Sequence, residues 1–368
     1  EVVAQVLATG QRKTLLTNAT DARYLAPGRL IFMRQGTLFA VPFDPDRLEL
    51  RGEPVAMLAE VANSLLSVFD YSATGVGQFA VSAIGDLAYI PEPVLAPPEN
   101  RLVTVDRTGR VEPLPAPARS YIGPTRVSHD GRKLAVTIRS LTELGIWIYD
   151  LTRQTLTRLT PPGGELSAPL WTPDGKRLAF RSLQSGVRTL VWQRAEGGVP
   201  PELLVEEWAS PGSWSPDGRE LAFLSKADIY ENSDIWIATL RSGAVTIRPF
   251  FESPDQEWCP EFSPDGRWLA YTSNTTGQHE VYVQPYPGPG PRQQVSVGGG
   301  INPAWNPAGR EIFFLSPLRD GTRAMMSVEV GLGHDLSIGS QRQLFKYTAL
   351  ELSFGSFPNR PYAVAPDG

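Results

Sequence analysis

The sequence predicts an all-β protein, a β-propeller of four-stranded blades, and three observations lead to this fold class. A phrase recurs along the chain, and its copies at residues 172–180, 215–223 and 263–271 share Pro-Asp-Gly followed by Leu-Ala-Phe or Leu-Ala-Tyr. The glycines of successive copies lie 43 to 48 residues apart, which is the period of a propeller blade; these are Gly85, Gly131, Gly175, Gly218, Gly266 and Gly309. A short alternating strand with aromatic residues, such as residues 145–150, follows the phrase in each unit.

The phrase itself predicts a hairpin turn followed by a buried strand. Proline sets φ at the first corner of the turn, aspartate hydrogen-bonds nearby backbone, and glycine accepts a positive φ. We therefore expect a turn role, and not a ring of metal-binding carboxylates, for Asp130, Gly131, Asp174, Gly175, Asp217, Gly218, Asp265 and Gly266. The apolar run after the turn is too short for a helix, and it predicts a strand covered on both faces.

The rest of each unit predicts a third and a fourth strand, such as residues 234–238 and residues 156–160. Seven phrases, from the one at Gly28 to the one at Gly309, are followed by enough sequence for a whole blade. Two end fragments remain: residues 2–7 and 13–17 predict the two outer strands of a blade, and residues 361–368 predict an innermost strand. We therefore predict about eight blades, the last composed from both chain ends, with seven as the alternative.

Bulk composition predicts one propeller domain over residues 1–368, because each blade buries its faces against two neighbours. The chain is 41% hydrophobic and has no run of 18 apolar residues that would span a membrane. A net charge of −5 argues against a nucleic-acid partner, and the single Cys259 excludes an intrachain disulfide. Because the chain starts at Glu1 and stops inside a turn phrase, we expect a fragment of a longer protein, with any membrane anchor upstream.

The loops that join neighbouring blades, and those that join second and third strands, predict the ligand-binding mouth. Carboxylates and aromatic residues gather there, and the predicted binding residues are Tyr121, Glu165, Glu207, Trp208, Asp228, Glu231, Glu257, Trp258 and Asn302. An acidic rim attracts a cation or a basic peptide, so a bound cation at the mouth is one expectation. The alternative is an ordinary solvated surface on an acidic protein.

Catalytic motifs are absent from the sequence, so we expect neither enzyme activity nor another cofactor. No Gly-x-Ser-x-Gly elbow occurs, and His129, His279 and His334 fall in different blades without metal-ligand spacing. Gly298-Gly299-Gly300 lacks the lysine of a phosphate loop. Acid/base cleavage of a glycoside by two of the mouth carboxylates remains an alternative.

The repeated phrase resembles the WD40-like, or PD40, repeat of TolB-type propellers over nearly the whole chain. A narrower resemblance, to the propeller that follows the kinase domain in bacterial membrane-anchored serine/threonine kinases, is carried by residues 7–10, 22–25, 36–44, 52–55 and 78–82. It implies an extracytoplasmic, membrane-tethered sensor module that binds a protein, peptide or glycan. No kinase or hydrolase domain is present, since neither a His-Arg-Asp loop nor an Asp-Phe-Gly motif occurs.

Two other functions fit the same repeats. One is the gating propeller of a prolyl-oligopeptidase-like serine peptidase, which predicts a hydrolase domain after Gly368. The other is a TolB-like periplasmic envelope protein, which predicts a signal peptide and a small α/β domain before Glu1. The flanking coding sequence distinguishes the three.

Overall fold

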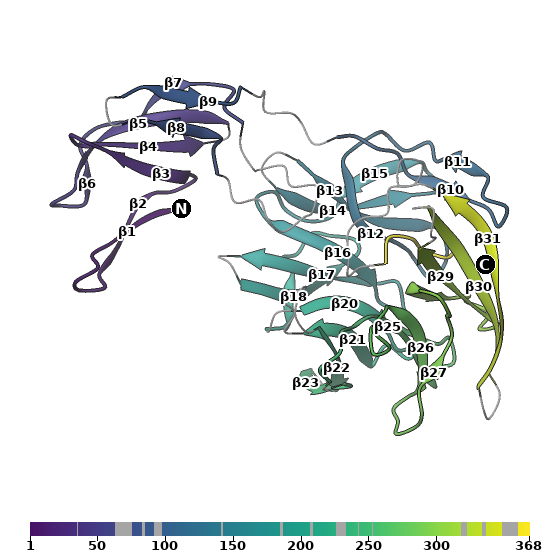
Figure 1. Cartoon of the computed structure of the whole chain (residues 1–368). Coiled ribbons are helices and arrows are strands. Elements are labelled where there is room, and N and C mark those ends of the chain that lie inside the picture. Colours follow the sequence, from purple (N-terminus) through teal and green to yellow (C-terminus); the bar gives the residue numbers. More distant parts are fainter. Residues whose placement is uncertain are drawn as a thin grey trace. The chain divides into compact units, whose positions relative to one another are not determined.

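The computed structural model describes residues 1–34, 36–62, 76–82, 85–91, 98–140, 143–184, 187–206, 209–225, 233–241, 243–251, 253–317, 322–332, 336–347 and 360–368. Every regular element in these ranges is a β-strand, which confirms the all-β prediction, and none is a helix fit to cross a membrane. The chain divides into two compact units, Glu1–Pro98 and Glu99–Gly368 (Figure 1). Each unit is described by itself.

The first unit contains three antiparallel sheets among its described residues. Two are hairpins: β1 (Val2–Gln5) pairs with β2 (Arg12–Leu16), and β8 (Phe79–Val81) pairs with β9 (Leu87–Tyr89). The third has the order β3-β4-β5-β6 with β7 also paired to β5, and its strands are β3 (Thr20–Leu25), β4 (Arg29–Arg34), β5 (Thr37–Asp44), β6 (Glu49–Leu50) and β7 (Val55–Leu58). Its core includes Phe32 and Val41, which are fully buried.

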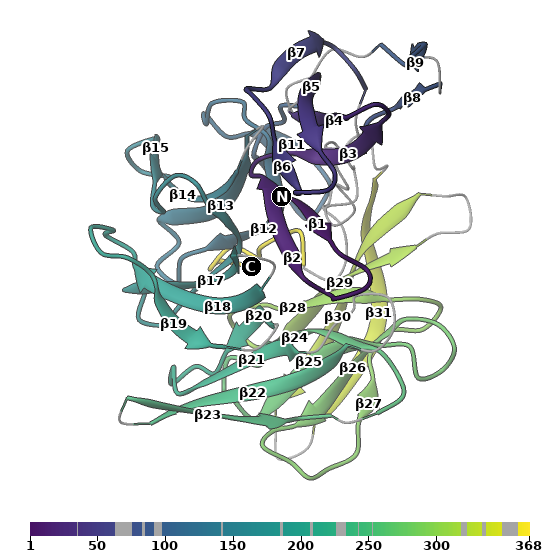
Figure 2. The ribbon, with the colours of Figure 1, turned by 90° about the vertical axis from the view of Figure 1, so that its left-hand side faces the viewer.

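The second unit consists of repeated antiparallel sheets in which strands adjacent in sequence pair with each other. Three sheets have four strands each. They are β20 (Ala209–Trp214), β21 (Glu220–Ser225), β22 (Asp234–Arg241) and β23 (Ala244–Pro249), shown side by side in Figure 2; β24 (Glu257–Phe262), β25 (Trp268–Ser273), β26 (Glu280–Pro285) and β27 (Gln293–Gln294); and β28 (Ile301–Trp305), β29 (Glu311–Pro317), β30 (Arg323–Leu332) and β31 (Leu336–Tyr347).

Ten further strands belong to this unit. Eight of them form one sheet, because a single residue pair, Leu144 and Glu165, joins two sets of four. These are β12 (Tyr121–Val127), β13 (Lys133–Arg139), β14 (Leu144–Asp150), β15 (Thr155–Arg158), β16 (Glu165–Trp171), β17 (Arg177–Gln184), β18 (Val187–Arg194) and β19 (Glu202–Val205). The other two, β10 (Val103–Val105) and β11 (Val111–Pro113), form a hairpin.

The repeated phrase forms the turn between the first and second strands of a sheet. In the turn between β20 and β21, Oδ1 of Asp217 accepts hydrogen bonds from the Ser215 hydroxyl at 2.6 Å and from the Arg219 N–H at 3.1 Å. Gly218 has a φ of 70° and its N–H donates to the carbonyl oxygen of Ser215. The same bonds and a glycine φ between 67° and 73° occur in the turns at Asp130, Asp174 and Asp265.

A β-bulge interrupts the first strand of each of these sheets, as register shifts in β12, β16, β20, β24 and β28 show. Four of the bulges hold a residue with positive φ, followed in each case by proline; these residues are Gly123, Ala168, Cys259 and Asn302. Proline fits there because the bulge breaks the ladder, so no N–H is needed. The bulge also increases the local twist and redirects the side chains beside it.

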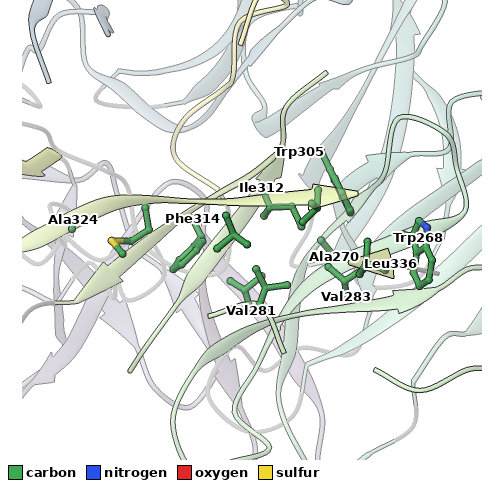
Figure 3. Packing of buried hydrophobic residues seen from close by; sticks show 13 residues of the cluster. Trp268, Ala270, Val281, Val283, Trp305, Ile312, Phe314, Ala324 and Leu336 are labelled. Carbon is green, nitrogen blue, oxygen red and sulfur yellow. The ribbon is translucent and has the colours of Figure 1, made fainter. Parts of the chain in front are cut away.

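The second strand of each sheet packs against the sheets on both sides. In β21, Leu221 and Phe223 join a cluster with residues of β17 and β18, whereas Ala222 joins one with residues of β24 and β25. Another such cluster fills the space between the β24–β27 sheet and the β28–β31 sheet (Figure 3). Burial on both faces explains why the second strands read as continuous apolar runs.

The C-terminal segment, residues 360–368, carries one more copy of the phrase and lies between β28 and β12. The Tyr362 hydroxyl donates to the carbonyl oxygen of Asn302 at 2.7 Å, and Nη1 of Arg126 donates to the carbonyl oxygen of Arg360 at 2.9 Å. The segment therefore contacts both the last and the first of the bulged strands. The number of blades, the composition of the last blade from both chain ends and the single-domain interpretation stay predictions.

Candidate functional site

The bulged strands of the second unit surround a small cavity. Its volume is about 10 Å³, which is room for one water-sized group. It is lined by Arg126 on β12, Pro211 and Gly212 on β20, Leu224 on β21, Cys259, Pro260 and Glu261 on β24, Pro303 on β28, and Arg360 of the C-terminal segment. Because most of these residues lie at bulges, the repeated backbone distortion brings side chains of different chemistry to one place.

Arg126 brings a positive charge into this cavity. The residue is only 7% exposed, and its Nη1 donates to the carbonyl oxygens of Thr125 at 3.1 Å and Arg360 at 2.9 Å. Its Nε has no hydrogen-bond partner among the described residues. Burial, together with the charge of Arg360, lowers the pKa of Arg126 to about 10, so the side chain remains protonated at neutral pH.

Arg360 is the second buried cation of the cavity. It is also 7% exposed, and its Nη2 lies 3.2 Å from Oε1 of Glu261. Its Nε likewise lacks a partner within the described ranges. Of the two guanidinium groups, only that of Arg360 pairs with the Glu261 carboxylate, and the three side chains carry a formal charge of +1.

Cys259 adds a thiol to the wall of the cavity. Its Sγ donates to Oδ1 of Asn302 at 3.0 Å. Burial raises the pKa of Cys259 to about 12, so the group is a protonated thiol at neutral pH. Since the thiolate is the nucleophilic form, this environment disfavours covalent chemistry at Cys259.

Three of the predicted mouth residues are buried in the same part of the unit. Glu257 begins β24 and is 1% exposed, and its carboxylate accepts hydrogen bonds from the hydroxyls of Ser253 and Ser273. Burial raises the pKa of Glu257. Trp258 stacks on His279 with 4.5 Å between ring centroids, and the backbone N–H of Asn302 donates to Oγ1 of Thr272 at 3.0 Å.

The other predicted residues are dispersed or undescribed. Tyr121 begins β12 and donates its hydroxyl to the carbonyl oxygen of Pro117 at 2.7 Å, while Glu165 begins β16 and is exposed. Glu207, Trp208, Asp228 and Glu231 lie outside the described residues. Within the described ranges, no three His, Cys, Asp or Glu side chains are placed to hold a metal ion. The binding roles of all nine residues stay predictions.

Sequence reasoning missed the charged residues of the cavity, although a signal for them exists. A proline stands three or four residues before the turn phrase in six copies, as Pro124, Pro169, Pro211, Pro260, Pro303 and Pro361. Proline inside a predicted strand marks a bulge. Residues beside these prolines include Arg360 and Glu261, and Arg126 follows Pro124 by two positions.

Comparisons with known proteins agree with this architecture. Residues 205–345 match the family model described as PD40, the TolB β-propeller domain. The chain is similar to a structure described as TolB from Agrobacterium tumefaciens, with a TM-score of 0.55 and 19% identity over 67% of this chain and 88% of that chain. It is also similar to TolB from Acinetobacter baumannii, with a TM-score of 0.47 and 13% identity over 86% of this chain and 67% of that one. The family match and the first structure show a TolB-type propeller fold.

One curated relative shares more sequence over a shorter stretch. A protein of Streptomyces coelicolor named as a tricorn protease homolog is 35% identical over 102 residues. This stretch covers 26% of this chain and 7% of the relative. The chain therefore matches a small part of the length of that protein.

Proposed function

We propose that this chain is a non-catalytic binding module, a propeller that holds a protein, peptide or glycan ligand at the bulged strands of its second unit. The observation that carries the proposal is a contrast between two parts of the same strands. The Asp-Gly pair of the turn repeats in four of the five bulged sheets, whereas four different residues, Gly123, Ala168, Cys259 and Asn302, have the positive φ at the bulges of four sheets. The repeated turn residues stabilise the fold, and the variable bulge residues are available for ligand recognition.

For the second unit we propose a closed ring of six blades, in place of the predicted last blade made from both chain ends. Five are the bulged sheets, and the sixth combines residues 360–368 with β10 and β11. Leu102 and Leu114 pack with the β12–β14 cluster, while Val105 and Tyr362 pack with the β28–β30 cluster, so this sixth blade has a neighbour on each side. A closed ring leaves only short, protected edges.

For the whole protein we propose an extracytoplasmic, membrane-tethered sensor or interaction module. The TolB-type fold and the resemblance of residues 7–82 to kinase-associated propellers support this role. The gating propeller of a serine peptidase is the second candidate, which the 35% identity with the tricorn protease homolog over 102 residues favours. Sequencing the flanking gene regions separates the two, because an upstream kinase domain supports the first and a downstream Gly-x-Ser-x-Gly domain supports the second.

Binding without turnover tests the proposed function of the chain itself. The purified chain is titrated calorimetrically with acidic, basic and neutral peptides and with neutral and acidic oligosaccharides, and each mixture is then analysed by mass spectrometry. We expect saturable binding of at least one class and full recovery of the ligand, with heat-unfolded chain as the control. Cleaved ligand in proportion to the amount of chain, or no binding of any class, contradicts the proposal.

A further inference from the structure

We propose that the cavity among the bulged strands is an anion site that binds one carboxylate group between Arg126 and Arg360. The inference deepens the proposed function and rests on it, because it names the chemistry of the ligand at the same site. The ligand class is a compound with a small, accessible carboxylate.

The charge balance of the cavity is the first argument. Arg126 has no ion pair with a described carboxylate, and Glu261 lies beside Arg360. A buried cation loses the hydration that it has in water, and backbone carbonyls replace only part of it. One additional negative charge would neutralise the group of three side chains.

The unused donors are the second argument. Nε of Arg126 and Nε of Arg360 are both buried without a partner among the described residues. Guanidinium groups bind carboxylates through pairs of N–H donors, and such charge-assisted hydrogen bonds are stronger than neutral ones. Both side chains line the cavity, so their remaining donors serve one ligand there.

The size and walls of the cavity are the third argument. A volume of about 10 Å³ holds one water-sized group, so it excludes a sugar ring or a phosphate ester and admits a single oxygen atom of a carboxylate. Pro211, Pro260 and Pro303 line it and offer an anion no N–H donor, and the two arginines are the cationic donors among the lining residues. The site thus selects by charge and by size.

A structural role for Arg126 is the competing explanation. The hydrogen bond from its Nη1 to the carbonyl oxygen of Arg360 holds the C-terminal segment against β12. Four chains separate the two explanations: the wild type, Arg126→Gln, Glu261→Gln and Arg181→Gln. Arg181 is a matched control, since it is 8% exposed and does not line the cavity, and its guanidinium donates to the Ser167 hydroxyl.

The experiment measures sodium acetate binding to each chain by calorimetry in chloride-free zwitterionic buffer, with the melting temperature followed in parallel. We expect saturable binding to the wild type, at least tenfold weaker binding to Arg126→Gln, and binding within twofold of wild type for Arg181→Gln. Glu261→Gln removes the competing carboxylate, so we expect several-fold tighter binding and a larger rise in melting temperature with acetate. Because this variant retains both arginines, it tests the site even where Arg126→Gln fails to fold.

Equal acetate binding by the wild type and folded Arg126→Gln, or no saturable binding to either the wild type or Glu261→Gln, overturns the proposal. N-acetyl-aspartate amide, with N-acetyl-asparagine amide as its neutral control, then distinguishes a peptide side chain from a free small anion as the source of the carboxylate. Acetate binding with no peptide or glycan ligand in the wider panel would contradict the proposed function alone. A panel ligand whose affinity is unchanged in Arg126→Gln would contradict the anion site alone.

Discussion

The turn and the bulge of each first strand lie a few residues apart, yet they differ in what the sequence repeats. In the turns, Asp217 and its counterparts make the same hydrogen bonds, and each glycine has nearly the same φ. In the bulges, the backbone distortion recurs while glycine, alanine, cysteine and asparagine occupy equivalent places. The comparison shows that backbone geometry recurs at both the turns and the bulges. The side chains recur only at the turns, where the aspartate side chain itself forms the hydrogen bonds that shape the backbone.

The largest expected effect comes from adding a side chain to a turn. Gly131 and Gly175 have φ values of 73° and 67°, so alanine at either position carries a left-handed strain of about 1 kcal/mol. A Cβ on Gly131 would lie 2.9 Å from Cγ of Pro366, whereas one on Gly175 would meet nothing within 4 Å. We expect Gly131→Ala to lower the free energy of unfolding by about 3 kcal/mol and Gly175→Ala by about 1 kcal/mol.

Urea denaturation of the two variants measures this difference. Gly218→Ala is an internal control, since its Cβ would lie 3.7 Å from Cδ of Pro173, which is an ordinary contact. We expect it to lower the free energy of unfolding by the same amount as Gly175→Ala. Equal losses at Gly131 and Gly175 would show that the C-terminal segment does not hold Pro366 against the first turn.

A smaller effect is expected from removing the turn aspartates. Hydrogen bonds from the hydroxyls of Thr172 and Ser215 lower the pKa of Asp174 and of Asp217. A carboxyl group whose pKa is lower in the folded chain stabilises the fold above its unfolded pKa of about 3.9, and this stabilisation is lost as the pH falls through the folded pKa. Because both side chains are exposed, we expect the double variant Asp174→Ala/Asp217→Ala to lose only about 1 kcal/mol in total at pH 7.

The pH dependence makes this prediction specific. We expect urea denaturation to show a smaller difference in the free energy of unfolding between wild type and double variant at pH 3 than at pH 7. A difference that is the same at both pH values would mean that the carboxylates do not provide the stabilisation.

The sequence predicts the turns and the second strands well because their determinants are local. Nine residues contain the proline, the aspartate, the glycine and the buried run, so their chemistry can be read without knowing what lies beyond. The cavity is different: Arg126 bonds to a residue 234 positions away, and Arg360 pairs with one 99 positions away. The mouth prediction placed Glu257 and Asn302 at a solvent-facing rim, but such a pattern cannot show that neighbouring strands bury them.

The smallest effect is expected from removing a side chain at a bulge, and it tests the other half of the comparison. Ala168 has a φ of 55° and is 2% exposed. Ala168→Gly relieves a left-handed strain of about 1 kcal/mol but costs a similar amount in chain entropy and lost packing, so we expect the free energy of unfolding to change by less than about 0.5 kcal/mol. Ala168→Val is the matched variant, and it should lose more than about 2 kcal/mol because a β-branched residue resists this φ. If urea denaturation instead shows that Ala168→Gly lowers the free energy of unfolding by more than about 1.5 kcal/mol, the methyl group itself stabilises the strand. The bulge residues would then serve the stability of the fold and not ligand recognition.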